Sequence, residues 1–223
     1  LEADGVGFIG RRIDEKSEFV TSSDIGFRRC QYANVPDGSL YILDMYREVI
    51  EHPASLPPAL KKHLDLTSGR ERGRLYRVVP DGFKQPALPK LAGATTAELV
   101  SLLESANGWH RDAAARLLYE RQDKGAVGPL EKLARESKSP LGRMHALYAL
   151  AGLEALNEKT LLPRLGDEHA GVREHALRLA EKLAKDSAVV RAAMLARVDD
   201  SELRVRYQAA FSLGQLPESS ERN

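Results

Sequence analysis

The chain has 223 residues, which exceeds a typical single domain and predicts one core plus a second module. Its 33 basic and 32 acidic side chains nearly cancel, which argues against a nucleic-acid or anionic-membrane surface. No apolar run approaches the roughly 18 residues that span a bilayer. We therefore expect no membrane span. A lone cysteine excludes an internal disulfide or a Cys-x-x-Cys motif, so we expect no such thiol site.

The first third of the chain has a β-rich pattern. Short apolar or β-branched runs between turn residues predict strands at 6–9, 18–21, 40–45 and 74–79. Pro36-Asp37-Gly38 supplies the turn of a hairpin before the run that begins at Leu40, and Ser55 with two following prolines predicts a short helix at 55–64. We therefore expect a small antiparallel sheet of three to five strands with an exposed edge over residues 1–86. The boundary falls in the stretch 80–89, which is rich in Pro and Gly.

Helical signals follow from residue 87 to residue 223. Thr95 and Glu98 form a capping-box pattern, and the further candidate helix starts are Asn107 or Gly108, Ser139 with Pro140, and Ser187. Breaks are predicted at Gly166-Asp167 and Asp199-Asp200. About eight helices in antiparallel pairs are expected, which makes the predicted fold class α+β and mainly α.

One phrase, an arginine followed by a small or apolar pair three and four residues later, occurs four times in this part. It begins at Arg111, Arg143, Arg173 and Arg206, with separations of 32, 30 and 33 residues. That period is typical of helix-turn-helix repeats, in which each unit buries its apolar face against the next. Residues 87–223 are therefore predicted to form an α-solenoid of about four repeats, the last one partial, with the four arginines as structural repeat positions.

The turns that precede the last two arginines carry a family resemblance. Asp167-Glu168-His169-Ala170-Gly171-Val172-Arg173 and Asp199-Asp200-Ser201-Glu202-Leu203-Arg204-Val205-Arg206 resemble the inter-helix turn of HEAT repeats. The resemblance implies that acidic and arginine side chains pair between neighbouring repeats. The turns before Arg111 and Arg143 depart from it, since they lack the valine and the full acidic turn.

The β-rich segment 8–79, above all 36–53 and 65–77, resembles the end of a glucose/sorbosone-dehydrogenase-like β-propeller. In the planctomycete-type bacterial proteins of this kind, often labelled membrane-bound dehydrogenases, HEAT repeats and commonly a cytochrome c-type haem domain follow the propeller. The resemblance implies an exported or periplasmic multidomain parent, of which this chain is about one blade plus the solenoid. The start at Leu1, without a signal-peptide pattern, also suggests a piece of a longer protein.

A propeller active site is assembled from several blades. Any quinone, calcium or haem would therefore belong chiefly to the rest of the parent, and we expect no catalytic residue, cofactor or metal ligand in this chain. Arg28, Asp44 and Arg47 are candidate channel-facing contacts for an anionic or sugar-like ligand, with strand-end charge pairing as the alternative. The histidines lack the spacing of a zinc motif. Trp109 is expected to pack against the first helical layer.

Three functions are compatible with these patterns. The favoured one is an interaction or scaffold module that binds a protein partner or positions a sister domain. The second is part of a quinone-dependent sugar or alcohol dehydrogenase that passes electrons to a haem domain. The third, a nucleic-acid-binding helical repeat, needs a basic concave face that the near-neutral charge does not favour. Association between copies through the exposed sheet edge is a further expectation.

Overall fold

The computed structural model describes residues 1–216 and is mainly helical, with a small antiparallel sheet toward the N-terminus. The chain divides into two compact units. One is formed by Arg12–Pro89, and the other joins Leu1–Arg11 to the residues from Lys90 onward. The first eleven residues, which the sequence groups with the β segment, therefore cluster with the helices. Residues 217–223 of the predicted partial repeat lie outside the described part of the chain.

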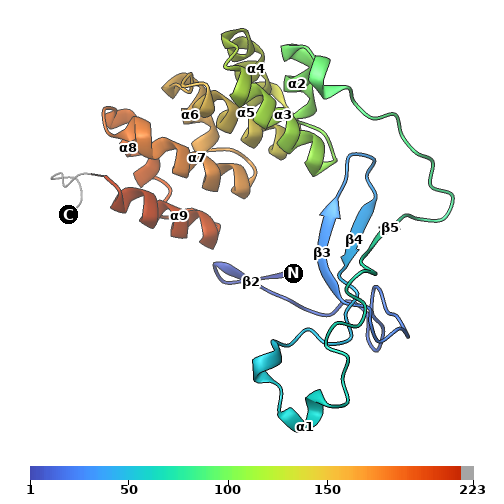
Figure 1. The fold of residues 1–223 in the computed structure, drawn as a ribbon. Helices are drawn as coiled ribbons and strands as arrows, with labels where there is room; N and C mark the ends of the chain where they lie inside the picture. The colour runs from blue at the N-terminus through green and yellow to red at the C-terminus, as the bar shows by residue number, and fades with distance from the viewer. Residues whose placement is uncertain (217–223) are drawn as a thin grey trace. The chain divides into compact units, whose positions relative to one another are not determined.

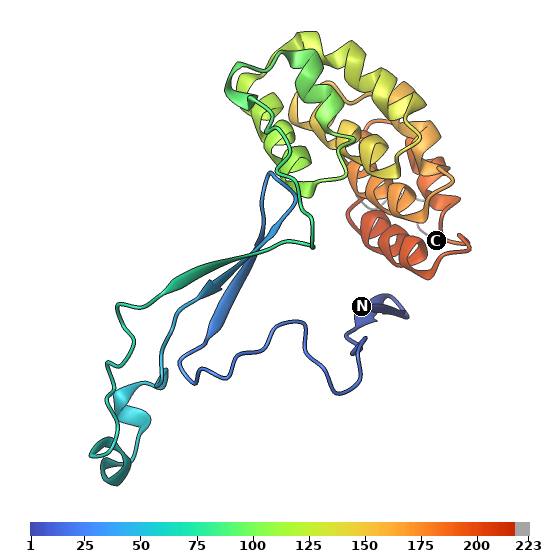
Figure 2. The same cartoon turned by 90° about the vertical axis from the view of Figure 1, so that its right-hand side faces the viewer.

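The unit of residues 12–89 contains one three-stranded antiparallel sheet, in the order β3-β4-β5 (Figure 2). Its strands are β3 (Arg29–Asn34), β4 (Leu40–Asp44) and β5 (Arg74–Val78). The hairpin between β3 and β4 is confirmed, and Gly38 in its turn has a φ of +83° that favours glycine. The loop from β4 to β5 carries a 3-10 turn (Pro53–Ser55) and α1 (Pro58–Lys61), so the helix predicted at 55–64 is shorter than expected.

Two strand predictions need correction. The strand expected at 18–21 is wrong, because no neighbouring strand lies alongside this exposed run to complete a hydrogen-bonded ladder. The strand expected at 6–9 exists as β2 (Gly7–Ile9), but it pairs with β1 (Glu2–Asp4) in a separate hairpin. Gly5, with a φ of +58°, makes the tight turn of that hairpin.

The three-stranded sheet has almost no core of its own. Ile42 of β4 is the one large hydrophobic residue that is buried among residues 12–89. Its register partners Tyr32 and Tyr76 stay exposed on the outer strands, as does Leu75. Within residues 12–89, both edge strands and much apolar area are therefore left uncovered. A sheet of three short strands normally needs a packed face to be stable.

The helices form two rows that pack on each other (Figure 1). One row consists of α2 (Thr96–Leu102), α4 (Val127–Glu136), α6 (Glu158–Leu165) and α8 (Ala188–Leu195). The other row consists of α3 (Gly108–Arg121), α5 (Pro140–Gly152), α7 (Ala170–Ala184) and α9 (Leu203–Gly214). Each helix contacts the next one in its own row and a helix of the facing row. We call the second group the α3–α9 row.

Local capping chemistry starts these helices where the sequence predicts. Thr95 and Glu98 make the complete capping box of α2, and Asn107, Ser139 and Ser187 cap α3, α5 and α8 through their side chains. The predicted breaks also hold, because α6 ends just before Gly166 and Asp199 lies between α8 and α9. Short 3-10 turns at Leu91–Gly93 and Lys124–Ala126 complete the helical unit.

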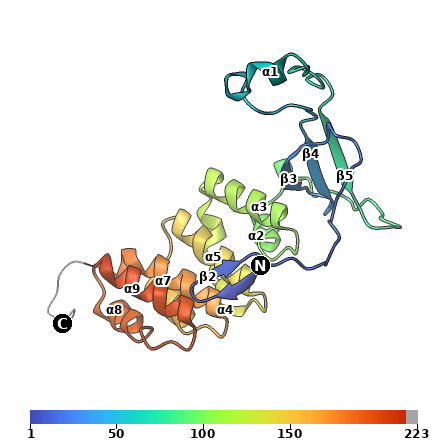
Figure 3. The same cartoon turned by 90° about the horizontal axis from the view of Figure 1, so that it is seen from below.

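The core between the two rows is aliphatic. The alanines at the repeated position are fully buried and let the helix backbones approach closely: Ala114, Ala146, Ala176 and Ala209. Leucines such as Leu118, Leu147 and Leu177 fill the space between them. The β1-β2 hairpin lies beside α9 (Figures 1 and 3), where the guanidinium of Arg204 stands 4.6 Å from the centre of the Phe8 ring. Within residues 1–216, no helix has both the length and the apolar character to cross a bilayer.

Candidate functional site

The four repeated arginines occupy the same structural position. Each one donates from Nη1 to the backbone carbonyl six residues upstream, in the turn before its own helix. The donor–acceptor pairs are Arg111 to Ser105 at 2.5 Å, Arg143 to Ser137 at 2.9 Å, Arg173 to Asp167 at 2.8 Å and Arg206 to Asp200 at 2.6 Å. The arginines therefore define equivalent positions along the α3–α9 row.

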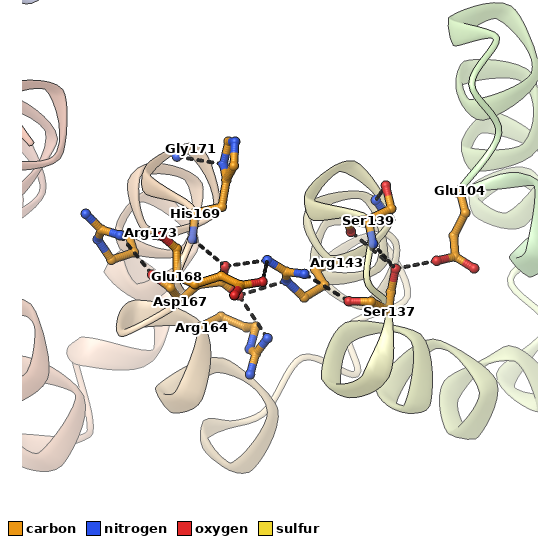
Figure 4. A network of polar contacts seen from close by, with 11 residues as sticks. Glu104, Ser137, Ser139, Arg143, Arg164, Asp167, Glu168, His169, Gly171 and Arg173 are labelled. Carbon is orange, nitrogen blue, oxygen red and sulfur yellow. Dashed lines mark hydrogen bonds and ion pairs between the residues drawn. The ribbon is translucent and has the colours of Figure 1, made fainter.

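Two of these arginines also bind the carboxylate of the following turn, and Figure 4 shows the first such pair, Arg143 with Asp167. Arg143 donates from Nε and Nη2 to Asp167 at 2.9 and 2.7 Å, and Arg173 donates to Asp200 at the same two distances. Arg143 is only 3% exposed and Asp167 only 5%. Such bidentate pairs are directional and tie one turn to the next.

The two aspartates stay ionised in spite of their burial. Burial raises the pKa of Asp167, but the hydrogen bonds from Arg143 and from the backbone N–H of His169 outweigh it and hold that pKa below its ordinary value. In the same way, Arg173 and the backbone N–H of Glu202 outweigh burial and lower the pKa of Asp200. A charged carboxylate is therefore the resting form in both turns.

Serines stand where the first two turns would carry an aspartate. Ser137 Oγ accepts the backbone N–H of Ser139, as Asp167 accepts that of His169, but it has no charge to offer Arg111. Ser137 instead donates to the Glu104 carboxylate (Figure 4). The Nε of Arg111 is consequently buried without a hydrogen-bond partner among residues 1–216.

A second set of contacts crosses between successive helices of the α3–α9 row. Tyr148 of α5 lies 2.9 Å from the Nδ1 of His175 on α7. Five residues after the next arginine, Arg178 of α7 donates to Gln208 of α9 at 2.9 Å. Sequence patterns miss these residues, because the equivalent positions carry different residue types.

The aromatic residues of the helical part all lie on helices of one row. The five aromatic residues between 90 and 216 all lie on the α3–α9 row and are at least 37% exposed: Trp109, Tyr119, Tyr148, Tyr207 and Phe211. We call them the aromatic surface. Trp109, expected to pack against the first helical layer, is 38% exposed at the start of α3. Aromatic side chains are enriched at the centres of protein interfaces, whereas the core of this unit uses none within the described residues.

A cleft of about 500 Å³ opens between the C-terminal ends of α5 and α7. Arg178, Lys182 and Lys185 line it together with Glu154 and Glu181. Its lining is mixed in charge and partly apolar, a composition that suits contact with a polypeptide.

Two of the three candidate residues of the β segment, Arg28 and Asp44, meet at the buried Asp44 carboxylate. Asp44 accepts the backbone N–H groups of Arg28 at 2.8 Å and of Tyr46 at 2.9 Å. The Arg28 side chain donates to the carbonyls of Ile25, Phe27 and Glu48, while Arg47 donates to the carbonyl of Tyr46. The structure thus brings Arg28 and Asp44 together and directs the side chains of both arginines to backbone carbonyls.

Three residues that sequence reasoning missed complete this cluster. Arg74 stacks 4.2 Å from the centre of the Tyr46 ring and lies 3.3 Å from Asp44 and 3.2 Å from Asp24. The backbone N–H of Gly26 is the chief cause that lowers the pKa of Asp24. Arg74 is the register partner of Asp44 in the β4-β5 ladder, and pairing those two strands would have found it.

No group of three His, Cys, Asp or Glu side chains in residues 1–216 is arranged to hold a metal ion. Residues 1–82 match the model of one protein family, described as a domain of unknown function, DUF7133. The match covers the β-rich segment and ends before the helical rows. No curated protein matches the chain.

Proposed function

We propose that this chain is an interaction module, in which a HEAT-like α-solenoid presents the aromatic surface to a protein partner or a sister domain. The observation that carries the proposal is the recurrence of the arginine cap at all four repeat positions, with two of the arginines tied to the next turn through an aspartate. Repeated units linked to their neighbours in this way form an extended surface, which is how helical-repeat proteins bind partners.

The second element of the proposal concerns the sheet. We propose that β3, β4 and β5 are a propeller blade at the end of a dehydrogenase-like propeller. Its support is the segment's resemblance to such propellers, the antiparallel order of the strands and the nearly absent core, since a blade is normally covered by its neighbours. The complete reading frame should then encode further blades upstream. A frame without them would contradict this element and leave the solenoid proposal untouched.

Site-specific photo-cross-linking tests the interaction surface. A photoreactive phenylalanine at Tyr119, on the α3–α9 row, should give discrete adducts in cells that express the native protein. The same group at Val189, on the other row, should give none. The two positions form a matched pair because they are 62% and 61% exposed. Equal adducts from both positions, or none from either, would contradict the proposal.

A further inference from the structure

Three kinds of contact between successive helices of the α3–α9 row stop at α9. In the first series, Arg143 binds Asp167 and Arg173 binds Asp200. The fourth repeated arginine, Arg206, donates from Nη1 to the carbonyls of Asp200 and Ser201, but no carboxylate within residues 1–216 binds it. Its Nε and Nη2 are thus left for an outside carboxylate.

The other two series end on aromatic residues. Tyr148 contacts His175 and Arg178 contacts Gln208, and the equivalent residue on α9 is Phe211. In the third series Glu174 of α7 pairs with Arg204 of α9 at 3.2 Å, and the residue of α9 equivalent to Glu174 is Tyr207. Positions that contact the next helix on α5 and α7 are therefore open on α9.

These open positions form an apolar stripe. Leu203, Tyr207 and Phe211 are spaced four residues apart on one face of α9 and are 42%, 49% and 55% exposed. The Tyr207 and Phe211 rings contact each other edge to face, with centres 4.8 Å apart. The β1-β2 hairpin reaches only the start of this face, where Gly5 lies beside Leu203 and Phe8 beside Arg204. We call Leu203, Arg206, Tyr207 and Phe211 the α9 face.

We propose that the α9 face binds an amphipathic helix of a partner, preceded by a turn that carries an aspartate. This inference rests on the proposed interaction function and specifies the partner. The existing interfaces fix the spacing, because Asp200 precedes Arg204 by four residues and Gln208 by eight. Since Tyr207 and Phe211 replace the polar Glu174 and Arg178, the incoming helix carries apolar residues at both of those positions. Its pattern is therefore aspartate, three residues, an apolar residue, three residues and a second apolar residue.

A second copy of this chain fits the α9 face less well. The row begins at α3, whose equivalent positions carry Ser105, Trp109 and Ala113. Trp109 and Ala113 satisfy the apolar requirement, but Ser105 offers Arg206 no charge. Charge complementarity therefore favours a partner helix with the aspartate over head-to-tail association of copies.

The test uses the full chain of 223 residues and a designed probe. The probe is a stapled, fluorescent peptide of residues 198–214 in which Arg204→Leu and Gln208→Leu supply the apolar positions and Asp200 is retained. Stapling is needed because short isolated helices are marginal in water. Fluorescence anisotropy should show saturable binding. Arg206→Gln in the protein, or Asp200→Asn in the peptide, should each weaken binding by about tenfold or more, and the two changes together by little more than either alone.

Further variants and a second measurement test whether binding occurs at the α9 face and whether the occupant is a partner helix or a second copy of the chain. Phe211→Gln should abolish binding, and Val189→Gln on the other row should leave it unchanged. Absence of binding, or equal affinity with Arg206→Gln, overturns the proposal. Sedimentation velocity that shows self-association lost with Trp109→Gln would assign the α9 face to a second copy and also overturn it. If the probe fails while the Tyr119 cross-links persist, this inference alone is lost; if the cross-links fail while the probe binds, the broader surface is lost.

Discussion

The Arg143 guanidinium and the Asp167 carboxylate, 24 residues apart in the sequence, form a buried bidentate pair between two successive turns. Neither group has free access to water, and the pair supplies two of the hydrogen bonds that each group makes. The backbone of Asp167 in turn receives Arg173. The pair therefore connects successive turns inside the helical unit and differs from an exposed surface salt bridge.

Breaking this pair should be costly. Asp167→Asn removes the carboxylate that Arg143 and Arg164 share and leaves the buried Arg143 charge only the exposed Glu168 carboxylate at 3.3 Å. We expect the free energy of unfolding to fall by about 3–5 kcal/mol. Urea denaturation, monitored by far-UV circular dichroism, measures this free energy. The control is Arg135→Gln, which removes a surface pair with Glu136 and should cost less than about 1 kcal/mol. Equal losses for the two variants would argue that the Arg143 pair contributes no more than a surface contact.

Arg111 offers the converse experiment. Ser137→Asp should supply the carboxylate that Arg111 lacks, provided that Glu104→Gln removes the neighbouring negative charge. The free energy of unfolding of the double variant should be about 1 kcal/mol higher than that of the Glu104→Gln single variant. Ser137→Asn in the same background is the matched control and should not reproduce the gain. A loss of stability with Ser137→Asp would show that the first turn differs from the later ones in geometry as well as in residue type.

Two histidines of the α3–α9 row make stability depend on pH. Burial, the largest cause for both, lowers the pKa of His145 and of His175 below the ordinary value of 6.5. The unfolded chain therefore takes up protons first, so stability is complete above about pH 6.5 and falls as the pH drops below it. Urea midpoints from pH 7.5 to 5 should show this fall. Replacing both histidines by glutamine should flatten the profile, and an unchanged slope in that double variant would contradict the assignment.

Acid has a second effect at lower pH. The pKa values of Asp167 and Asp200 are lowered in the fold, so their contribution is present above the ordinary value of 3.8 and is lost as the pH falls through the lowered values. The wild-type chain should therefore lose stability in two separate steps. In Asp167→Asn, the second step should be smaller.

Gly69 should be the least replaceable glycine of the β unit. It has a φ of +82°, and a Cβ there would stand 2.6 Å from the carbonyl oxygen of Tyr46. Gly69→Ala should destabilise this unit by about 2 kcal/mol or more, through both the conformation and the clash. Gly82→Ala is the control, with a φ of +73° but open space around it, and it should cost only about 1 kcal/mol. Limited proteolysis of residues 12–89 would rank the two variants.

The two units should differ in autonomy. A fragment of residues 90–216 keeps the aliphatic core and should show cooperative unfolding and slow amide exchange. A fragment of residues 12–89 buries only Ile42 among its large hydrophobic residues and should exchange its amides rapidly and show poor NMR dispersion. A well-dispersed spectrum of the second fragment would contradict the idea that the sheet needs neighbouring blades.

Much of the helical architecture is legible in the sequence because its signals are local or repeated. The Thr95–Glu98 capping box and the Asp200 turn are decided within a few residues, and the arginine phrase recurs with the same residue type. Contacts between helices are different. Tyr148, Arg178 and Phe211 occupy one structural position with three unrelated chemistries, so no pattern connects them before the helices are placed.

The β segment was harder to predict for the opposite reason. Whether a β-branched run such as 18–21 becomes a strand depends on a partner at the right place, and none is there. The separate hairpin at the N-terminus depends likewise on which run pairs with which. Asp44 and Arg74 meet across strands joined by a long loop, and local sequence does not set that register.

The arginine contacts form one unbroken line. From the carbonyl of Ser137 it runs through Arg143, Asp167, Arg173 and Asp200 to Arg206, and alternates side chains with backbone carbonyls. A tensile load applied along this line would fall on short, directional charged bonds before it reached the leucine contacts. Under stretching, the helical part should therefore extend little at first and then lose its arginine–aspartate pairs one after another.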